Sequence, residues 1–154
     1  MQSVSTSRIN DSMYEDSKSN TKRKILIVDD NEDQLVMYKF LFTSFNNKYD
    51  YLTFSSPEEA MNYMNKLKNK KYRNILNELD NINLIISDYN MFPKNGLEFF
   101  KELNNQGIVI PFVLFSSFIS NAIVSEAKSL GIVECIEKDI NIQNTIDKLG
   151  FYLI

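Results

Sequence analysis

Five residues that could do chemistry together each follow a short apolar run of the sequence. They are Asp29, Asp30, Asp88, Ser116 and Lys138. A cluster of carboxylates repels itself unless a cation lies among it, and an all-oxygen ligand set suits Mg²⁺ or Mn²⁺. A lysine ammonium and a serine hydroxyl would add donors for anionic oxygens. These residue types therefore predict a phosphoryl-transfer site with a carboxylate nucleophile, where metal and lysine stabilise the charge of the transferring group.

The apolar runs predict the elements that must position these residues. Buried strands are expected at 24–28, 49–54, 84–87, 109–115 and 132–137. Amphipathic segments with capping residues predict helices over 32–45, from 56 past 67, from 95 or 96 to 103, over 120–131 and after 141. This alternation predicts an α/β fold with a doubly wound parallel sheet. Ligands of such sheets gather at the carboxyl ends of the strands, where the five residues would meet.

Each of these residues also has an ordinary explanation when it is taken alone. An aspartate at a strand end usually caps a turn or a helix. Ser116 and its neighbour Ser117 could be plain loop hydroxyls, and Lys138 alone would be a solvated surface lysine. The combination favours a site, because unrelated caps would not fall at the ends of the first, third, fourth and fifth strands.

Four segments of the sequence resemble the receiver domains of response regulators. They are KILIVDDNED at 24–33, LIISDYNMFPKNG at 84–96, IPFVLFSS at 110–117 and EKD at 137–139. The resemblance covers about residues 24–150. It implies a flavodoxin-like (βα)5 fold with strand order 2-1-3-4-5.

The resemblance also implies roles for single residues. Asp88 would be the phosphoacceptor. The metal would be held by Asp29, Asp30, Asp88 and the backbone carbonyl of Asn90. Ser116 and Lys138 would contact the phosphoryl group.

Two small residues also match the family's pattern. Ser117 corresponds to the small residue beside the hydroxyl residue Ser116. Gly96 keeps the family's distance from the acceptor Asp88, 96 − 88 = 8 positions.

The sequence departs from the family at three positions. The proline expected four residues after the acceptor is Phe92, with Pro93 next, so we expect a modest rearrangement of that loop. Asp139 replaces the proline after Lys138, so the family's pattern does not predict the direction of the lysine side chain. Asp139 could form an ion pair with Lys138. Cys135 replaces a switching aromatic residue, so the usual coupling must be partial, rerouted or absent. A redox role for Cys135 is the weaker reading, because a buried thiol is ordinarily inert.

Two segments lie outside the family's pattern. Residues 1–23 are polar and predict a disordered tail, which leaves 24–154 as the receiver domain. Asp30 and Asp88 are 88 − 30 = 58 positions apart, more than receivers usually show. The surplus falls at 66–80. We interpret it as a solvated helix or loop, in preference to a partner-docking surface.

Composition excludes several classes of function. A chain of 154 residues with 44% hydrophobic residues can bury a core. It has no histidine, which excludes histidine-based acid–base catalysis and histidine-ligated metal sites, and its net charge of −3 argues against nucleic-acid binding. The single cysteine, with no apolar run long enough for a membrane span or a signal peptide, predicts a cytoplasmic protein without membrane contact.

Together these features predict a stand-alone receiver of two-component or phosphorelay signalling. Asp88 would be phosphorylated by a sensor histidine kinase or a histidine phosphotransfer protein. The receiver would assist its own phosphoryl transfer and hydrolysis without being a dedicated enzyme. Output would pass to an unknown downstream protein, from a monomer or a phosphorylation-dependent dimer.

Two alternative functions compete with this interpretation. A non-phosphorylated pseudo-receiver, acting as a constitutive interaction module, is supported by Cys135 and Asp139. A phosphohydrolase with an aspartyl nucleophile is disfavoured, because enzymes of the haloacid dehalogenase type carry a second aspartate where this chain has Asn90.

Overall fold

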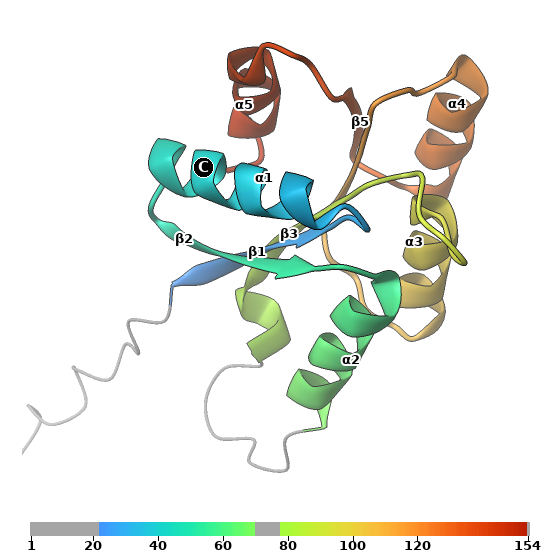
Figure 1. Ribbon diagram of the computed structural model, residues 1–154. Helices are drawn as coiled ribbons and strands as arrows, with labels where there is room; N and C mark the ends of the chain where they lie inside the picture. The colour runs from blue at the N-terminus through green and yellow to red at the C-terminus, as the bar shows by residue number, and fades with distance from the viewer. Residues whose placement is uncertain (1–21, 70–77, 154) are drawn as a thin grey trace, which may run out of the picture.

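In the computed structural model, which describes residues 22–69 and 78–153, a five-stranded parallel sheet lies between two layers of helices (Figure 1). The strands are β1 (Arg23–Val28), β2 (Tyr49–Phe54), β3 (Ile82–Ser87), β4 (Phe112–Ser116) and β5 (Glu134–Glu137). They are arranged in the order β2-β1-β3-β4-β5. The flavodoxin-like fold and its strand order are therefore confirmed.

The helices divide between the two faces of the sheet. They are α1 (Glu32–Phe45), α2 (Pro57–Lys68), α3 (Gly96–Asn105), α4 (Asn121–Leu130) and α5 (Ile142–Gly150), with a short 3₁₀ helix, η1 (Glu78–Asn81), before β3. Helices α1 and α5 cover one face, and α2, α3 and α4 cover the other (Figure 1). No helix of the described residues is both long and apolar enough to cross a bilayer.

Each central strand sends side chains into both core layers, which is why its sequence is apolar without interruption. On β1, Ile25 and Ile27 pack under α1 and α5, while Leu26 and Val28 pack against the opposite helices. All four are buried. This double burial holds the strand ends, and the polar residues that follow them, in fixed places.

Helix starts follow the capping residues of the sequence. The side chain of Asn31 accepts a hydrogen bond from Gln34 N at the start of α1. Asn95 and Glu98 form a complete capping box at the start of α3. Gly131 ends α4 with a φ of 95°, a conformation that glycine adopts without strain.

Two strands begin later than predicted. β4 begins at Phe112 because Val109 lies in solvent at 87% exposure and Pro111 has no N–H for the ladder. β5 begins at Glu134 because Ile132 N bonds the carbonyl of Ala127 and so belongs to the end of α4.

Two other predictions fall largely outside the described residues. The predicted tail of residues 1–23 is described only from Lys22, and Arg23 pairs with Tyr49 as the first residue of β1. Of the long segment 66–80, the structure describes the end of α2 and the start of η1. The tail and the docking surface stay predictions.

Candidate phosphoacceptor site

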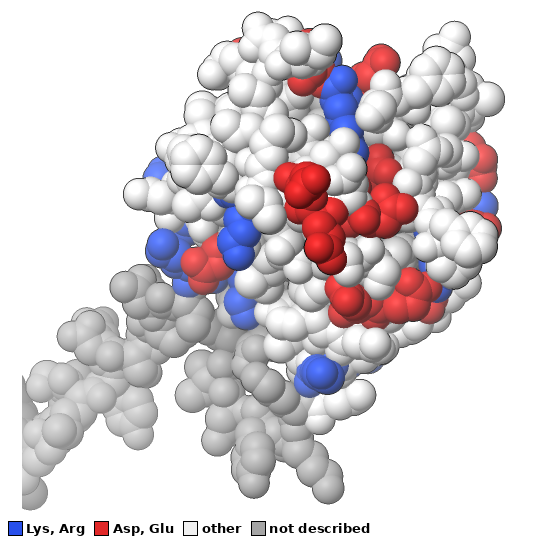
Figure 2. All heavy atoms as spheres, in the orientation of Figure 1, with Lys and Arg blue, Asp and Glu red and all other residues white. Residues whose placement is uncertain are grey.

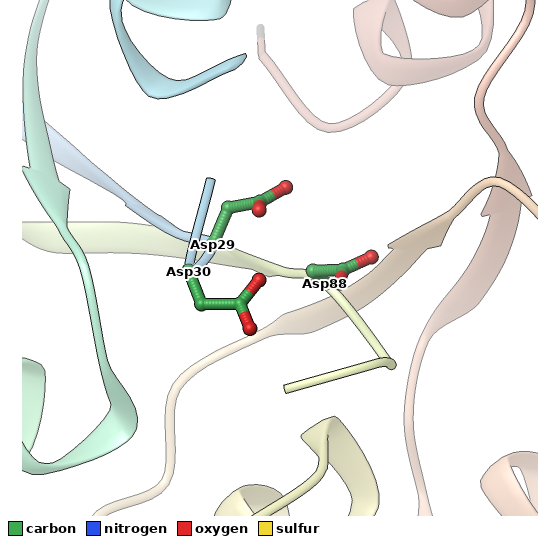
Figure 3. A group of neighbouring side chains, drawn as sticks. All are labelled: Asp29, Asp30 and Asp88. Carbon is green, nitrogen blue, oxygen red and sulfur yellow. The ribbon is translucent and has the colours of Figure 1, made fainter. Parts of the chain in front are cut away.

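Three carboxylates converge at the carboxyl ends of β1 and β3 (Figure 3). Asp29, Asp30 and Asp88 each offer an oxygen, and these oxygens lie within 4.8 Å of one another. Asp29 and Asp88 are buried, while Asp30 is exposed. Figure 2 shows acidic side chains gathered in the middle of the visible face.

The backbone fixes where the buried carboxylates lie. Asp29 N donates to the carbonyl of Phe54 at 3.2 Å, and Asp88 N donates to the carbonyl of Val28 at 2.8 Å. These two bonds tie the ends of β1, β2 and β3 to one another. Asp29 and Asp88 therefore leave the sheet side by side.

Lys138 places its ammonium between these carboxylates. Its Nζ lies 2.6 Å from Asp29 Oδ2 and 3.2 Å from Asp88 Oδ1, and its side chain is 8% exposed. The backbone N–H of Lys138 donates to the carbonyl of Ser116 at 2.8 Å, which joins the ends of β5 and β4. A buried ammonium beside two carboxylates is a donor for any anionic group that reaches Asp88.

The Lys138 ammonium also lies over two aromatic rings. The ring centroids of Tyr38 and Phe115 are 5.9 and 5.5 Å from Nζ, within the range of a cation–π contact. Burial, followed by the charges of Asp29 and Asp88, raises the pKa of Tyr38 to about 12. Tyr38 therefore stays a neutral phenol beneath the lysine.

The electrostatics of Asp88 favour a cation in the site. Burial raises the pKa of Asp88 above its usual range, and Asp29 raises it further, while Lys138 and Ser116 act in the opposite direction. Three carboxylates and one ammonium sum to −3 + 1 = −2. Hard carboxylate oxygens at this spacing fit a divalent ion such as Mg²⁺.

The remaining predicted site residues surround Asp88 at different depths. Ser116 is fully buried at the end of β4, whereas Ser117 is exposed. Asn90 is exposed, and its side-chain amide reaches the Ser116 hydroxyl at 3.5 Å, the limit of a hydrogen bond. The structure thus places Ser116 and Asn90 next to the carboxylates.

Gly96 allows the loop after Asp88 to close tightly. A Cβ at this position would lie 2.5 Å from the carbonyl oxygen of Asp88 and 2.7 Å from a methyl group of Leu114. Gly96 N donates to the carbonyl of Tyr89 at 3.0 Å. Only glycine leaves room for this approach of α3 to Asp88.

The suggested ion pair between Asp139 and Lys138 is not formed. The carboxylate of Asp139 instead accepts from Asn141 N and Asn144 Nδ2, both at 2.8 Å. These bonds, led by that from Asn144, lower the pKa of Asp139. Asp139 therefore stabilises the start of α5, and Lys138 turns to the buried carboxylates.

Cys135 lies opposite Leu114 in the pairing of β5 with β4. It is partly buried and packs against the core layer of α2, α3 and α4. Burial, and then Glu134, raises the pKa of its thiol. A raised thiol pKa agrees with the unreactive reading of this cysteine.

One residue of the site, Gln34, is not among those that the sequence pattern predicts. Gln34 accepts a hydrogen bond from Lys138 Nζ at 2.6 Å. Its position three residues after the N-cap Asn31 was an available signal, because a side chain there commonly turns back toward the helix start. Tyr38, one helical turn further on, lies under the same ammonium.

Comparison with known proteins agrees with this architecture. The model of the response regulator receiver domain matches residues 25–150. No curated protein matches the sequence. Many solved structures are similar in fold.

Three of these solved structures illustrate the similarity. The chemotaxis protein CheY4 of Vibrio cholerae is 24% identical, with a TM-score of 0.66 over 86% of this chain and 99% of its own. The phosphorylated cyanobacterial phytochrome response regulator RcpA is 23% identical, with a TM-score of 0.68 over 86% and 95%. The non-phosphorylated HemR receiver domain of Leptospira biflexa is 20% identical, with a TM-score of 0.67 over 86% and 94%.

The matched segment spans most of the chain and contains Asp29, Asp88, Ser116 and Lys138. It also contains every strand of the described sheet apart from the first residues of β1. The chain therefore belongs to the response regulator receiver domain family of two-component signalling.

Proposed function

We propose that this receiver takes a phosphoryl group on Asp88 in a Mg²⁺-dependent reaction and passes the signal on by protein–protein contact. The donor would be a sensor histidine kinase or a histidine phosphotransfer protein. The observation that carries this proposal is the buried Asp88 carboxylate, which lies 3.2 Å from the Lys138 ammonium and within the group of three carboxylates.

Asp29, Asp30 and Asp88 would hold Mg²⁺ or Mn²⁺, together with the backbone carbonyl of Asn90. The donor set consists of hard oxygens, and the exposure of Asp30 leaves one side of the site open to solvent. When bound, the ion would offset the repulsion between the carboxylates and stabilise negative charge on the phosphoryl oxygens.

A phosphohistidine donor would lie outside this sequence, because the sequence has no histidine. A carboxylate oxygen of Asp88 would form a bond to phosphorus as the bond from phosphorus to the donor imidazole nitrogen breaks. That nitrogen keeps the electron pair and takes up a proton. Lys138 Nζ would donate to one phosphoryl oxygen, and the Ser116 hydroxyl would donate to another.

The direct test is phosphorylation by a small donor. The protein is incubated with Mg²⁺ and acetyl phosphate, and its intact mass is measured with and without a chelator. We expect the mass of one phosphoryl group on the wild type, none on Asp88→Asn, and none after chelation. An unmodified wild type that also fails to bind beryllofluoride would contradict the proposal.

A constitutive interaction module is the second candidate. It is favoured by Cys135, which brings no aromatic ring to β5 at the position where many family members carry one. If Asp88→Asn and the beryllofluoride complex bind a downstream partner as the unmodified wild type does, this second function is supported.

A further inference from the structure

The ammonium of Lys138 has a third acceptor that phosphoryl transfer does not itself require. This acceptor is Oε1 of Gln34, at 2.6 Å, as short as the contact with Asp29. Gln34 is the third residue of α1 and is partly buried. Three oxygens, one each from Asp29, Gln34 and Asp88, thus lie within 3.2 Å of an ammonium that has three N–H groups.

The side chain of Gln34 can reach Lys138 because Asp29 accepts the hydrogen bond that the third side chain of a helix usually accepts. In a capping box, the third side chain of a helix accepts from the N–H of the N-cap residue, as Glu98 does from Asn95 N at 2.8 Å. At α1, the N–H of Asn31 donates instead to Asp29 Oδ1 at 2.9 Å. The backbone N–H of Gln34 still donates to Asn31 Oδ1 at 3.1 Å, so its backbone is fixed while its amide reaches Lys138.

Gln34 differs from the other two acceptors in charge. The carboxylates of Asp29 and Asp88 are the groups that a metal ion and a phosphoryl group would engage. A neutral amide oxygen neither neutralises the ammonium nor competes strongly for a divalent ion. Asp139, which follows Lys138 in the sequence, does not hold the ammonium, because its carboxylate accepts hydrogen bonds from Asn141 and Asn144.

We propose that Gln34 is a positioning residue that holds the ammonium of Lys138 in place while Asp88 is modified. The contact with Asp88 is the longest of the three, at 3.2 Å, and would be exchanged for a phosphoryl oxygen. The contacts with Gln34 and with the rings of Tyr38 and Phe115 would remain. The proposal rests on the proposed phosphoacceptor function.

Two substitutions and a matched control test this role. Gln34→Leu removes the acceptor at similar volume, and Gln34→Glu keeps an acceptor but adds a negative charge. Gln143→Leu is the control, because Gln143 lies exposed in the first turn of α5, where its backbone N–H donates to Asn141 and its side-chain amide donates to Asp147. Circular dichroism and thermal melting first establish that each variant is folded.

The first measurement needs neither metal nor phosphoryl donor. Proton exchange of the Lys138 ammonium is followed by nitrogen-15 NMR, with the exposed Lys128 as an internal reference. Loss of a hydrogen bond to a charged group predicts roughly tenfold faster exchange in Gln34→Leu. Gln34→Glu, whose carboxylate is a stronger acceptor for the ammonium, should exchange no faster than wild type, and Gln143→Leu should exchange at the wild-type rate. Wild-type exchange in Gln34→Leu overturns the proposal.

The second measurement separates anion binding from metal binding by calorimetry. We expect Gln34→Leu to bind beryllofluoride about tenfold more weakly while its Mg²⁺ affinity stays within about twofold of wild type. Gln34→Glu should also bind beryllofluoride more weakly, because of its added charge, and Gln143→Leu should match wild type. An equal loss of Mg²⁺ and beryllofluoride binding in Gln34→Leu would mean a general structural role and would overturn the proposal.

The two measurements also distinguish failure of the proposed function from failure of this inference. A wild type that binds no beryllofluoride contradicts the phosphoacceptor function, and ammonium exchange then decides whether Gln34 holds Lys138. A wild type that binds beryllofluoride, with Gln34→Leu unchanged in both measurements, contradicts the role of Gln34 alone.

Discussion

At the scale of single residues, the ionisation of Asp88 affects the stability of the folded protein. Its folded-state pKa is raised, chiefly by burial, so the folded protein binds this proton more tightly than the unfolded chain does. The free energy of unfolding therefore falls as pH rises from the ordinary carboxyl range through the raised pKa. Above that window the charged Asp88 makes the metal-free protein less stable.

The raised pKa of Asp88 predicts that Asp88→Asn is more stable than wild type near neutral pH in the presence of a chelator. The advantage should shrink as pH falls to about 4, where the unfolded carboxyl also takes up a proton. Thermal melting across this range checks the prediction. Asp50→Asn, an exposed carboxylate on β2, should show no such pH-dependent advantage. A pH-independent advantage in Asp88→Asn would show that its charge is not the cause.

Gly96 gives a second prediction at this scale. Gly96→Ala would push its Cβ against the Asp88 carbonyl and Leu114, so we expect about 2–4 kcal/mol lower stability and slower phosphorylation by acetyl phosphate. Chemical denaturation and intact-mass kinetics check both effects. Gly150→Ala is the matched control, because nothing lies within 4 Å of its Cβ at the end of α5. Equal stability of the two variants would contradict the steric reading.

The sequence pattern predicted that the five candidate site residues would lie together, because each follows an apolar strand and parallel strands bring their carboxyl ends to one edge. It did not predict the partner of Lys138 or that of Asp139. Those partners depend on which side chains lie close to the start of each helix: Asp29 accepts from the N–H of Asn31, and Asp139 accepts from the side-chain amide of Asn144. Such choices follow from three-dimensional distances that residue spacing leaves open.

At the scale of elements, α5 contains a polar group that its packing does not satisfy. Thr145 is 1% exposed, and among the described residues its hydroxyl has no hydrogen-bond partner. Thr145→Val keeps the shape and removes the buried hydroxyl, so we expect about 1 kcal/mol higher stability by chemical denaturation. Thr43→Val, on the exposed side of α1, should change stability by less than about 0.5 kcal/mol. A destabilised Thr145→Val would reveal a hydrogen bond for this hydroxyl.

The elements themselves were predicted more securely than their ends. Apolar runs and capping residues located the strands and helices of the described segments. The predicted starts of β4 and β5 were wrong because apolar residues come before the first paired residue of each strand: Val109 lies in solvent, and Ile132 closes α4. Hydrophobicity alone does not distinguish a paired residue from one that covers a loop.

At the scale of the whole molecule, the site exists only when the sheet is assembled. Asp29 and Lys138 are 109 residues apart in sequence and meet through the order of four strands. Because the unfolded chain lacks this arrangement, a divalent ion should bind the folded state selectively and stabilise it.

We therefore expect Mg²⁺ at about 100 times its Kd to raise the free energy of unfolding of the wild type by about 2.7 kcal/mol. Asp30→Asn, which removes the exposed carboxylate of the group, should respond less at the same concentration. Chemical denaturation with and without Mg²⁺ measures the difference. The same gain in wild type and Asp30→Asn would place the ion elsewhere.

The net charge of −2 among Asp29, Asp30, Asp88 and Lys138 has a consequence for the lifetime of the protein in a cell. Proteases degrade the transiently unfolded population, and that population would shrink if a divalent ion bound the folded site. Turnover would then slow as free magnesium rises. The abundance of this receiver would follow the ionic state of its surroundings.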